Sequence, residues 1–190
     1  MRKLIDDRAC RLHTLAGRGA QRDALAMLDA GAVTALTFND VGIASTHPGV
    51  TVSTAKGIFN RLAGSRPDVI VAELGDGILG EYGVQDILRD PELTGVGAAY
   101  VMAAPDPVAC WGAVELMRRE FGLPIAAITG PATDNEVGQI YITGGLGLPA
   151  HNARRDAAGL LAVVRKSIEE WRGSAAVELR ESAGYQLSAT

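Results

Sequence analysis

The sequence is poor in cysteine, in basic charge and in long apolar runs. Cys10 and Cys110 are too few for a disulfide framework, which favours a reducing compartment. No apolar run approaches the roughly 18 residues that span a bilayer, and the first residues do not resemble a signal peptide. The net charge is -4, whereas proteins that bind nucleic acid typically carry a basic surface. These absences predict a cytoplasmic protein that binds neither membranes nor nucleic acid.

The sequence also lacks the usual loop for nucleotide phosphates. That loop reads GxxxxGK[ST], and none of the three lysines, Lys3, Lys56 and Lys166, follows glycines at this spacing. The stretch Gly17-Arg18-Gly19 is too short to replace it. On these residues alone, the chain does not hold a triphosphate in the usual way.

Apolar runs alternate with segments of helical spacing along the 190 residues. The runs predict strands at 9–15, 33–38, 69–74, 98–103, 124–129 and 148–152. The spacing predicts helices around 24–28, 55–62, 108–121, 134–144 and 156–171. We expect one domain over 1–171 and a loosely ordered tail over 172–190.

Residues at the helix ends support this division. Asp106 followed by Pro107 is a typical helix start, and Gly31, Gly64 and Gly122 are placed to end helices in the left-handed conformation. Strands that alternate with helices predict an α/β fold, with a mainly parallel sheet and helices on both faces. In such folds ligands bind beyond the carboxyl ends of the strands.

Carboxylates follow several of the predicted strands. In DVIVAELGDGILG, residues 68–80, a buried strand leads into Glu73 and Asp76 among glycines, and Asp40 follows the preceding strand. An acidic residue after such a run is the Walker B pattern, which holds Mg²⁺ beside nucleotide phosphates. We therefore expect Glu73, Asp76 and Asp40 to share one pocket. The alternative is that each is a helix cap or a solvated turn residue.

Other reactive side chains have simpler interpretations. His13, His47 and His151 lack the spacing of metal ligands, which favours surface or strand-end positions. Trp111 and Trp171 fall on helix faces that are expected to be buried.

Five segments together resemble a known family. They are LAGRGAQRDALAMLDAGA, FNDVGIAST, DVIVAELGDGILG, VMAAPDPVA and ITGPATDN, and the resemblance covers about residues 8–170. It is to P-loop nucleotide-binding domains of the branch that contains dethiobiotin synthetase and the cobyrinate-amidating enzymes. Closer still are relatives in which such a domain follows a Rossmann-like one, some of them associated with D-glutamate N-acetylation. The resemblance implies ATP and Mg²⁺ as cofactors and a small carboxylate as substrate.

The resemblance also implies roles for single residues. Glu73 matches the acidic end of the Walker-B-like strand and would bind Mg²⁺ or act as the catalytic carboxylate, while Asp76 and Asp40 would lie in the same pocket. The residues implied to contact substrate or phosphate are Arg18, Arg22 and Asp23. Those implied to lie beside the nucleobase are Thr129, Pro131 and Thr133.

In the family, a first strand and the phosphate loop precede the segment that matches residues 9–15. By the resemblance, we expect either that the gene model is truncated or that the protein has lost the loop. By the resemblance, the missing strand belongs between 69–74 and 98–103, so these two would not pair directly. A second copy of the chain or a partner segment would then supply the missing strand.

Three classes of function remain open after this comparison. The first is an ATP- and Mg²⁺-dependent enzyme of the ligase or transferase type. The second is an acyltransferase of the N-acetyltransferase type, in which the phosphates would belong to coenzyme A. The third is a non-catalytic remnant that binds a metabolite or a partner chain.

Overall fold

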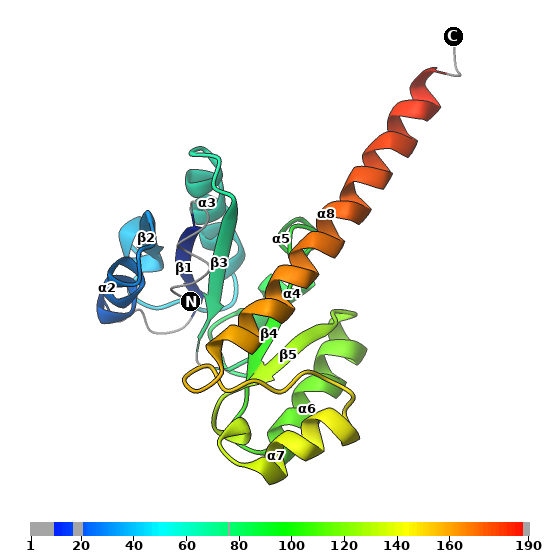
Figure 1. The fold of residues 1–190 in the computed structure, drawn as a ribbon. Helices are drawn as coiled ribbons and strands as arrows, with labels where there is room; N and C mark the ends of the chain where they lie inside the picture. Colours follow the sequence, from blue (N-terminus) through cyan, green and yellow to red (C-terminus); the bar gives the residue numbers. More distant parts are fainter. Residues whose placement is uncertain (1–9, 17–20, 76, 188–190) are drawn as a thin grey trace. The chain divides into compact units, whose positions relative to one another are not determined.

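The computed structural model describes residues 10–16, 21–75 and 77–187. The chain divides into two compact units, residues 1–96 and 97–190 (Figure 1). Each unit contains parallel strands and helices, so the molecule is a mixed α/β protein. The prediction that 1–171 acts as one domain stays a prediction.

The first unit contains a three-stranded parallel sheet. Its strands are β1 (Cys10–Ala16), β2 (Thr34–Thr37) and β3 (Val69–Leu74). The order is β2-β1-β3, and both outer strands run parallel to β1. The predicted parallel arrangement is therefore confirmed for these three strands.

Helices and turns of the first unit pack on this sheet and on one another. They are α2 (Gln21–Asp29), a 3-10 turn (Phe38–Val41), α3 (Thr51–Ala63), α4 (Val84–Arg89) and α5 (Pro91–Thr94). Helix α3 contacts β1 and α4, and it buries Ala55, Ile58 and Leu62. Its apolar residues at helical spacing therefore face the core as predicted.

The second unit is built around β4 (Tyr100–Ala103) and β5 (Ile125–Thr129), which are parallel. Where a last strand over 148–152 was predicted, only one parallel bridge joins Ile128 to Ala150. Among the described residues β4 pairs with β5, and β3 pairs with β1. Whether a further strand belongs between β3 and β4 stays a prediction.

The helices of the second unit follow the predicted order. They are α6 (Pro107–Leu116) with a π turn (Met117–Phe121), a 3-10 turn (Pro131–Thr133), α7 (Glu136–Ile140) with a π turn (Tyr141–Gly145), and α8 (Ala157–Leu187). Helix α8 contacts β5 and continues through 172–187, where the sequence indicated a loosely ordered tail. Among the described residues, no helix is both long and apolar enough to cross a membrane.

Three local expectations are wrong. Trp171 was expected to lie on a buried helix face, but it is 37% exposed. Trp111 was expected to face the core, but it is 54% exposed, because α6 turns Cys110 inward instead. Gly64 was expected to be left-handed, but its φ is -54°, since the chain makes one more turn before Arg66 takes a φ of 52°. Gly31 and Gly122 do adopt the expected left-handed φ.

Candidate functional site

The carboxyl edge of the three-stranded sheet brings two predicted site residues to one side. Thr14 of β1 is aligned with Thr37 of β2 and with Glu73 of β3. Neighbouring strands lie about 4.8 Å apart, so the Cα atoms of Thr37 and Glu73 are separated by about 10 Å. Asp40 is hydrogen-bonded to Thr37, and it therefore lies at the same edge as Glu73. The predicted placement of these two carboxylates at one edge agrees with the sheet register.

The Asp40 carboxylate closes the turn that follows β2. Its Oδ2 accepts hydrogen bonds from the Thr37 amide, at 2.6 Å, and from the Thr37 hydroxyl, at 3.1 Å. The Thr37 hydroxyl in turn accepts from the amide of Asn39, which completes a capping box. Asp40 is therefore a turn cap, which was the simpler interpretation. Any role in catalysis would use the other carboxylate oxygen.

Glu73 occupies the last position but one of β3 and is exposed. It precedes Leu74 and a turn that includes Gly77, whose φ of 85° suits glycine. In the described part of the chain, no three His, Cys, Asp or Glu side chains gather as metal ligands. Asp76, the third carboxylate predicted here, lies outside the described residues. The Mg²⁺ and catalytic roles of this group therefore remain predictions.

Of the three predicted substrate-binding residues, Asp23 lies on helix α2, which follows β1. Helix α2 begins at Gln21, five residues after β1 ends, and carries Asp23 in its first turn. Arg18 and the side chain of Arg22 lie outside the described residues. The substrate-binding roles of all three residues stay predictions.

The carboxyl ends of β4 and β5 form a second edge, in the other unit. The carbonyl of Thr129 accepts from the Ala104 amide at 3.0 Å, and its hydroxyl accepts from the Ala153 amide at 3.0 Å. Thr133 is buried and donates its hydroxyl to the Gly130 carbonyl at 2.7 Å. Both threonine hydroxyls therefore hold the loop together, and of the three residues predicted beside a nucleobase only Pro131 lines a hollow.

That hollow lies beyond the ends of β4 and β5. Its volume is about 370 Å³, and it is lined by Pro105, Asp106, Pro107, Pro131, Ala132, Asn135, Val137 and Gly138. The volume lies within the range of small-molecule sites. Most of the lining is apolar, and only two side chains bring polar groups to it.

The two polar residues of the hollow are both helix caps. Asp106 Oδ1 accepts from the Ala109 amide at 2.8 Å, which confirms the predicted start of α6. Asn135 Oδ1 accepts from the Gly138 amide at 2.9 Å. This leaves Asp106 Oδ2 as an acceptor and Asn135 Nδ2 as a donor at the hollow.

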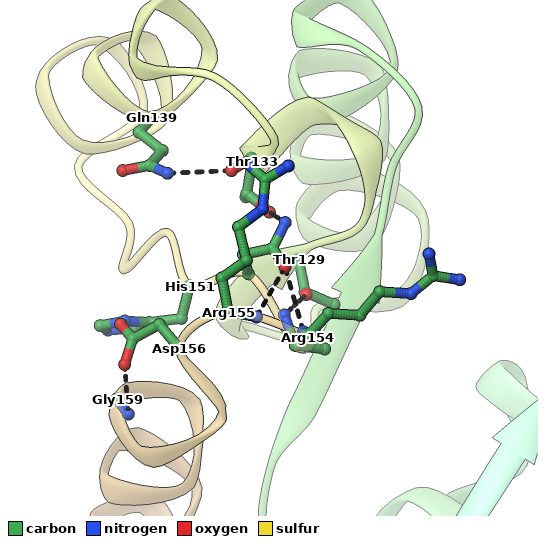
Figure 2. Close-up of polar contacts among 10 residues, drawn as sticks. Thr129, Thr133, Gln139, His151, Arg154, Arg155, Asp156 and Gly159 are labelled. Atoms are coloured by element: carbon green, nitrogen blue, oxygen red, sulfur yellow. Dashed lines mark hydrogen bonds and ion pairs between the residues drawn. The ribbon is translucent and has the colours of Figure 1, made fainter.

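A polar network that the sequence did not predict lies beside this edge (Figure 2). Asn152 is 7% exposed and donates Nδ2 to Asp134 Oδ1 at 2.7 Å. Its Oδ1 accepts from the amides of Arg154 and Arg155 at 3.0 and 3.1 Å. The network fixes the segment after Ala150 to the loop after β5. Asn152 and Asp134 are 18 residues apart, so only the turn-forming residues of NARRD could have indicated the network.

His151 belongs to an ion pair at the start of α8. Its Nδ1 lies 2.7 Å from Asp156 Oδ2, and Asp156 Oδ1 accepts from the Gly159 amide at 3.0 Å. The hydrogen bond from His151, followed by the bond from Gly159, lowers the pKa of Asp156. His151 directly follows the bridge residue Ala150.

Neither a family model nor a curated protein matches the chain.

Proposed function

We propose that the chain is part of a nucleotide-dependent enzyme that uses ATP and Mg²⁺ to activate a small carboxylate. The observation that carries the proposal is the shared edge of Glu73 and Asp40 on a parallel sheet. Parallel sheets bind ligands at this edge, and carboxylates placed there suit Mg²⁺, which needs only one or two of them besides phosphate and water. The resemblance to the dethiobiotin synthetase branch supports the same assignment and a P-loop-type fold.

Within this proposal, Glu73 holds Mg²⁺ or its water shell, and Asp40 contributes the oxygen that its turn leaves unused. Mg²⁺ held there would supply charge neutralisation at the phosphates. The substrate carboxylate would attack the γ-phosphorus of ATP, the bond to the bridging oxygen would break, and ADP would leave. Arg18, Arg22 and Asp23 would orient the substrate or the phosphates. The protein would contribute mainly position and electrostatics, because phosphoryl transfer requires little else from it.

Separately, and for the second unit alone, we propose that the hollow binds an adenine base. Asp106 and Asn135 offer it one acceptor and one donor. Adenine presents the complementary pair, an amino group next to a ring nitrogen. The proline rings of Pro107 and Pro131 would contact the faces of the base.

Coenzyme A carries the same adenine, so the hollow also suits the acyltransferase alternative. The two classes differ in what Mg²⁺ does, since only the ATP-dependent enzyme needs it at Glu73. The non-catalytic alternative differs from both, because it requires no nucleotide.

Equilibrium binding of ATP with and without Mg²⁺, and of acetyl-CoA, tests the proposal on the full chain. ATP is expected to bind more tightly with Mg²⁺, and acetyl-CoA more weakly than ATP. Val137→Glu places a negative charge at the hollow and is expected to weaken ATP binding at least tenfold. Val108→Glu is the matched control, because both valines are 76% exposed and only Val137 lines the hollow.

Two results would count against the proposal. Tight binding of acetyl-CoA that is independent of Mg²⁺, with weak ATP binding, would favour the acyltransferase. The absence of binding to either nucleotide would favour the non-catalytic class.

A further inference from the structure

Helices α6 and α7 turn large apolar side chains toward solvent. Their exposed fractions are 76% for Val108 and Val137, 61% for Ile140, 54% for Trp111 and 38% for Tyr141. Val108 and Trp111 are three residues apart and share one face of α6. Ile140 and Tyr141 follow Val137 by three and four residues and share one face of α7 and its π turn. Each of the two helices therefore presents an apolar face.

The two apolar faces lie next to each other. Helix α6 contacts the π turn that continues α7, and the two segments lie side by side in Figure 1. Pro107 and Val137, at the starts of the two helices, line the same hollow. The inner sides of the two segments carry the buried residues Cys110, Gly138 and Ile142. The five exposed apolar side chains therefore form one surface, the α6/α7 surface.

The α6/α7 surface is large for a patch that is open to water. With fully exposed areas of roughly 150–250 Å² for large side chains, the exposed fractions amount to about 500–600 Å². The largest apolar patch on a typical monomer covers about 300–600 Å². Two such surfaces in contact would bury about 1,000–1,200 Å² of apolar area, which is enough for a specific protein interface.

The end of the surface at the helix starts is acidic. Asp106 begins α6 and Glu136 begins α7, and both residues are exposed. Within the described part of the chain, neither carboxylate takes part in an ion pair. Both are therefore available to a positive charge on another molecule.

The far end of α6 is basic on the same side of the helix. Arg118 and Arg119 follow Trp111 by seven and eight residues, about two helical turns, while Glu120 lies further round the helix. Both arginines pair with Glu115, at 3.1 and 2.6 Å, and their side chains are 63% and 66% exposed. Two guanidinium groups share one carboxylate, so this end has a net positive charge and can bind a further carboxylate.

We propose that the α6/α7 surface binds the same surface of a second copy of this chain, related by a two-fold axis. Antiparallel packing of the two α6 helices brings Val108 and Trp111 of each copy against the other. It also places the acidic end of each copy opposite the basic end of its partner, so the charge pattern is complementary to itself. Two-fold dimers are the commonest oligomers, and their interfaces use one surface twice in this way.

Sedimentation velocity of the full chain over a range of concentrations tests the inference. The wild type is expected to dimerise with a dissociation constant in about the micromolar range or below. Trp111→Glu and Ile140→Glu are each expected to weaken the dimer at least about 100-fold, because a buried charge then faces the apolar surface twice. Leu79→Glu is the control, because Leu79 is 73% exposed but belongs to the first unit. Circular dichroism melts check that each variant is folded.

Charge reversal tests the antiparallel arrangement separately. Arg119→Glu is expected to weaken the dimer about tenfold, because it sets like charges against each other at both ends. Glu136→Arg in the same chain is expected to recover part of that loss, since each copy then carries both reversed charges.

Three results would overturn the inference and leave the proposed function intact. The first is a wild type that stays monomeric at about 100 μM, far above the expected dissociation constant. The second is a dimer that folded Trp111→Glu and Ile140→Glu leave unchanged. The third is equal weakening by Leu79→Glu, which would show that the added charge acts without regard to its place.

Discussion

Asn152 donates a hydrogen bond from its Nδ2 to Asp134 Oδ1 across 2.7 Å, and so joins two segments that are 18 residues apart. The same side chain accepts from the amides of Arg154 and Arg155. Since the Asn152 side chain is buried, its removal takes the hydrogen-bond partner from each of these part-buried groups.

Asn152→Ala is therefore expected to lower the free energy of unfolding by about 2–3 kcal/mol. Chemical denaturation followed by circular dichroism measures it. Gln139→Ala is the control, because the side-chain amide of Gln139 donates one hydrogen bond to the Thr133 carbonyl. Loss of this bond should lower the free energy of unfolding by about 1 kcal/mol or less. Equal effects of the two variants would show that the network contributes little.

Gly138 is required by close packing between α7 and the loop after β5. A Cβ at this position would overlap the carbonyl oxygen of Ala132, a backbone atom that cannot move aside by rotation. Gly138→Ala is expected to destabilise the protein by about 2 kcal/mol or more and to distort the hollow.

Gly112→Ala is the matched helical control. A Cβ there meets no atom within 4 Å, so the variant is expected to be neutral or more stable by about 0.5–1 kcal/mol. Thermal melts of the two variants give the comparison. A Gly138→Ala protein as stable as Gly112→Ala would contradict the tight packing of Gly138 against Ala132.

The ion pairs of Lys56 predict a defined dependence of stability on pH. Lys56 Nζ lies 2.8 Å from Asp90 and 3.0 Å from Glu92. The hydrogen bond to Asp90, followed by that to Glu92, raises the pKa of Lys56, and Lys56 lowers the pKa of Asp90. The contribution of Lys56 to stability is present at pH values below the pKa of the lysine in the unfolded chain. It is lost as the pH rises through the raised pKa of the folded protein. The contribution of Asp90 to stability is lost as the pH falls through its lowered pKa in the folded protein.

Lys56→Met should therefore be less stable than the wild type between about pH 5 and pH 9, with the difference shrinking at both extremes. The difference should also shrink in 0.5 M salt, because the pair is partly exposed. Denaturation at several pH values measures this. A deficit that is constant into strong acid would mean that Lys56 acts by packing and not by charge.

The strands were predictable because their apolar runs are continuous and end in polar residues or glycine. Strand β3 begins and ends where its sequence pattern does. The segment 148–152 contains the same Leu-Pro dipeptide that precedes β5, but it forms only one bridge. The residues that follow are held instead by hydrogen bonds to side chains, such as that from the Ala153 amide to the Thr129 hydroxyl. The pair Asp90-Pro91 begins α5 just as Asp106-Pro107 begins α6, so the same signal could have revealed that helix.

The exposed face of α6 and the network of Asn152 were not predictable in the same way. Helix α6 is apolar at nearly every position, so helical spacing could not decide between Trp111 and Cys110 as the inward residue. Asn152 and Asn135 acquire their roles from contacts across turns and between distant segments. The carboxylates Asp40 and Asp106 could be found because each lies three residues after the end of a strand.

The Mg²⁺ dependence of ATP binding by Glu73→Gln tests the central claim most directly. The measurement is the ratio of the ATP dissociation constants without and with Mg²⁺, for the wild type, Glu73→Gln and the charge-matched control Glu120→Gln, each with a denaturation curve. The account predicts a ratio of at least tenfold in the wild type and the control. For Glu73→Gln it predicts a ratio near one, with a free energy of unfolding within about 0.5 kcal/mol of the wild type, because the side chain is exposed. An unchanged ratio in Glu73→Gln would contradict the claim that this carboxylate serves the metal.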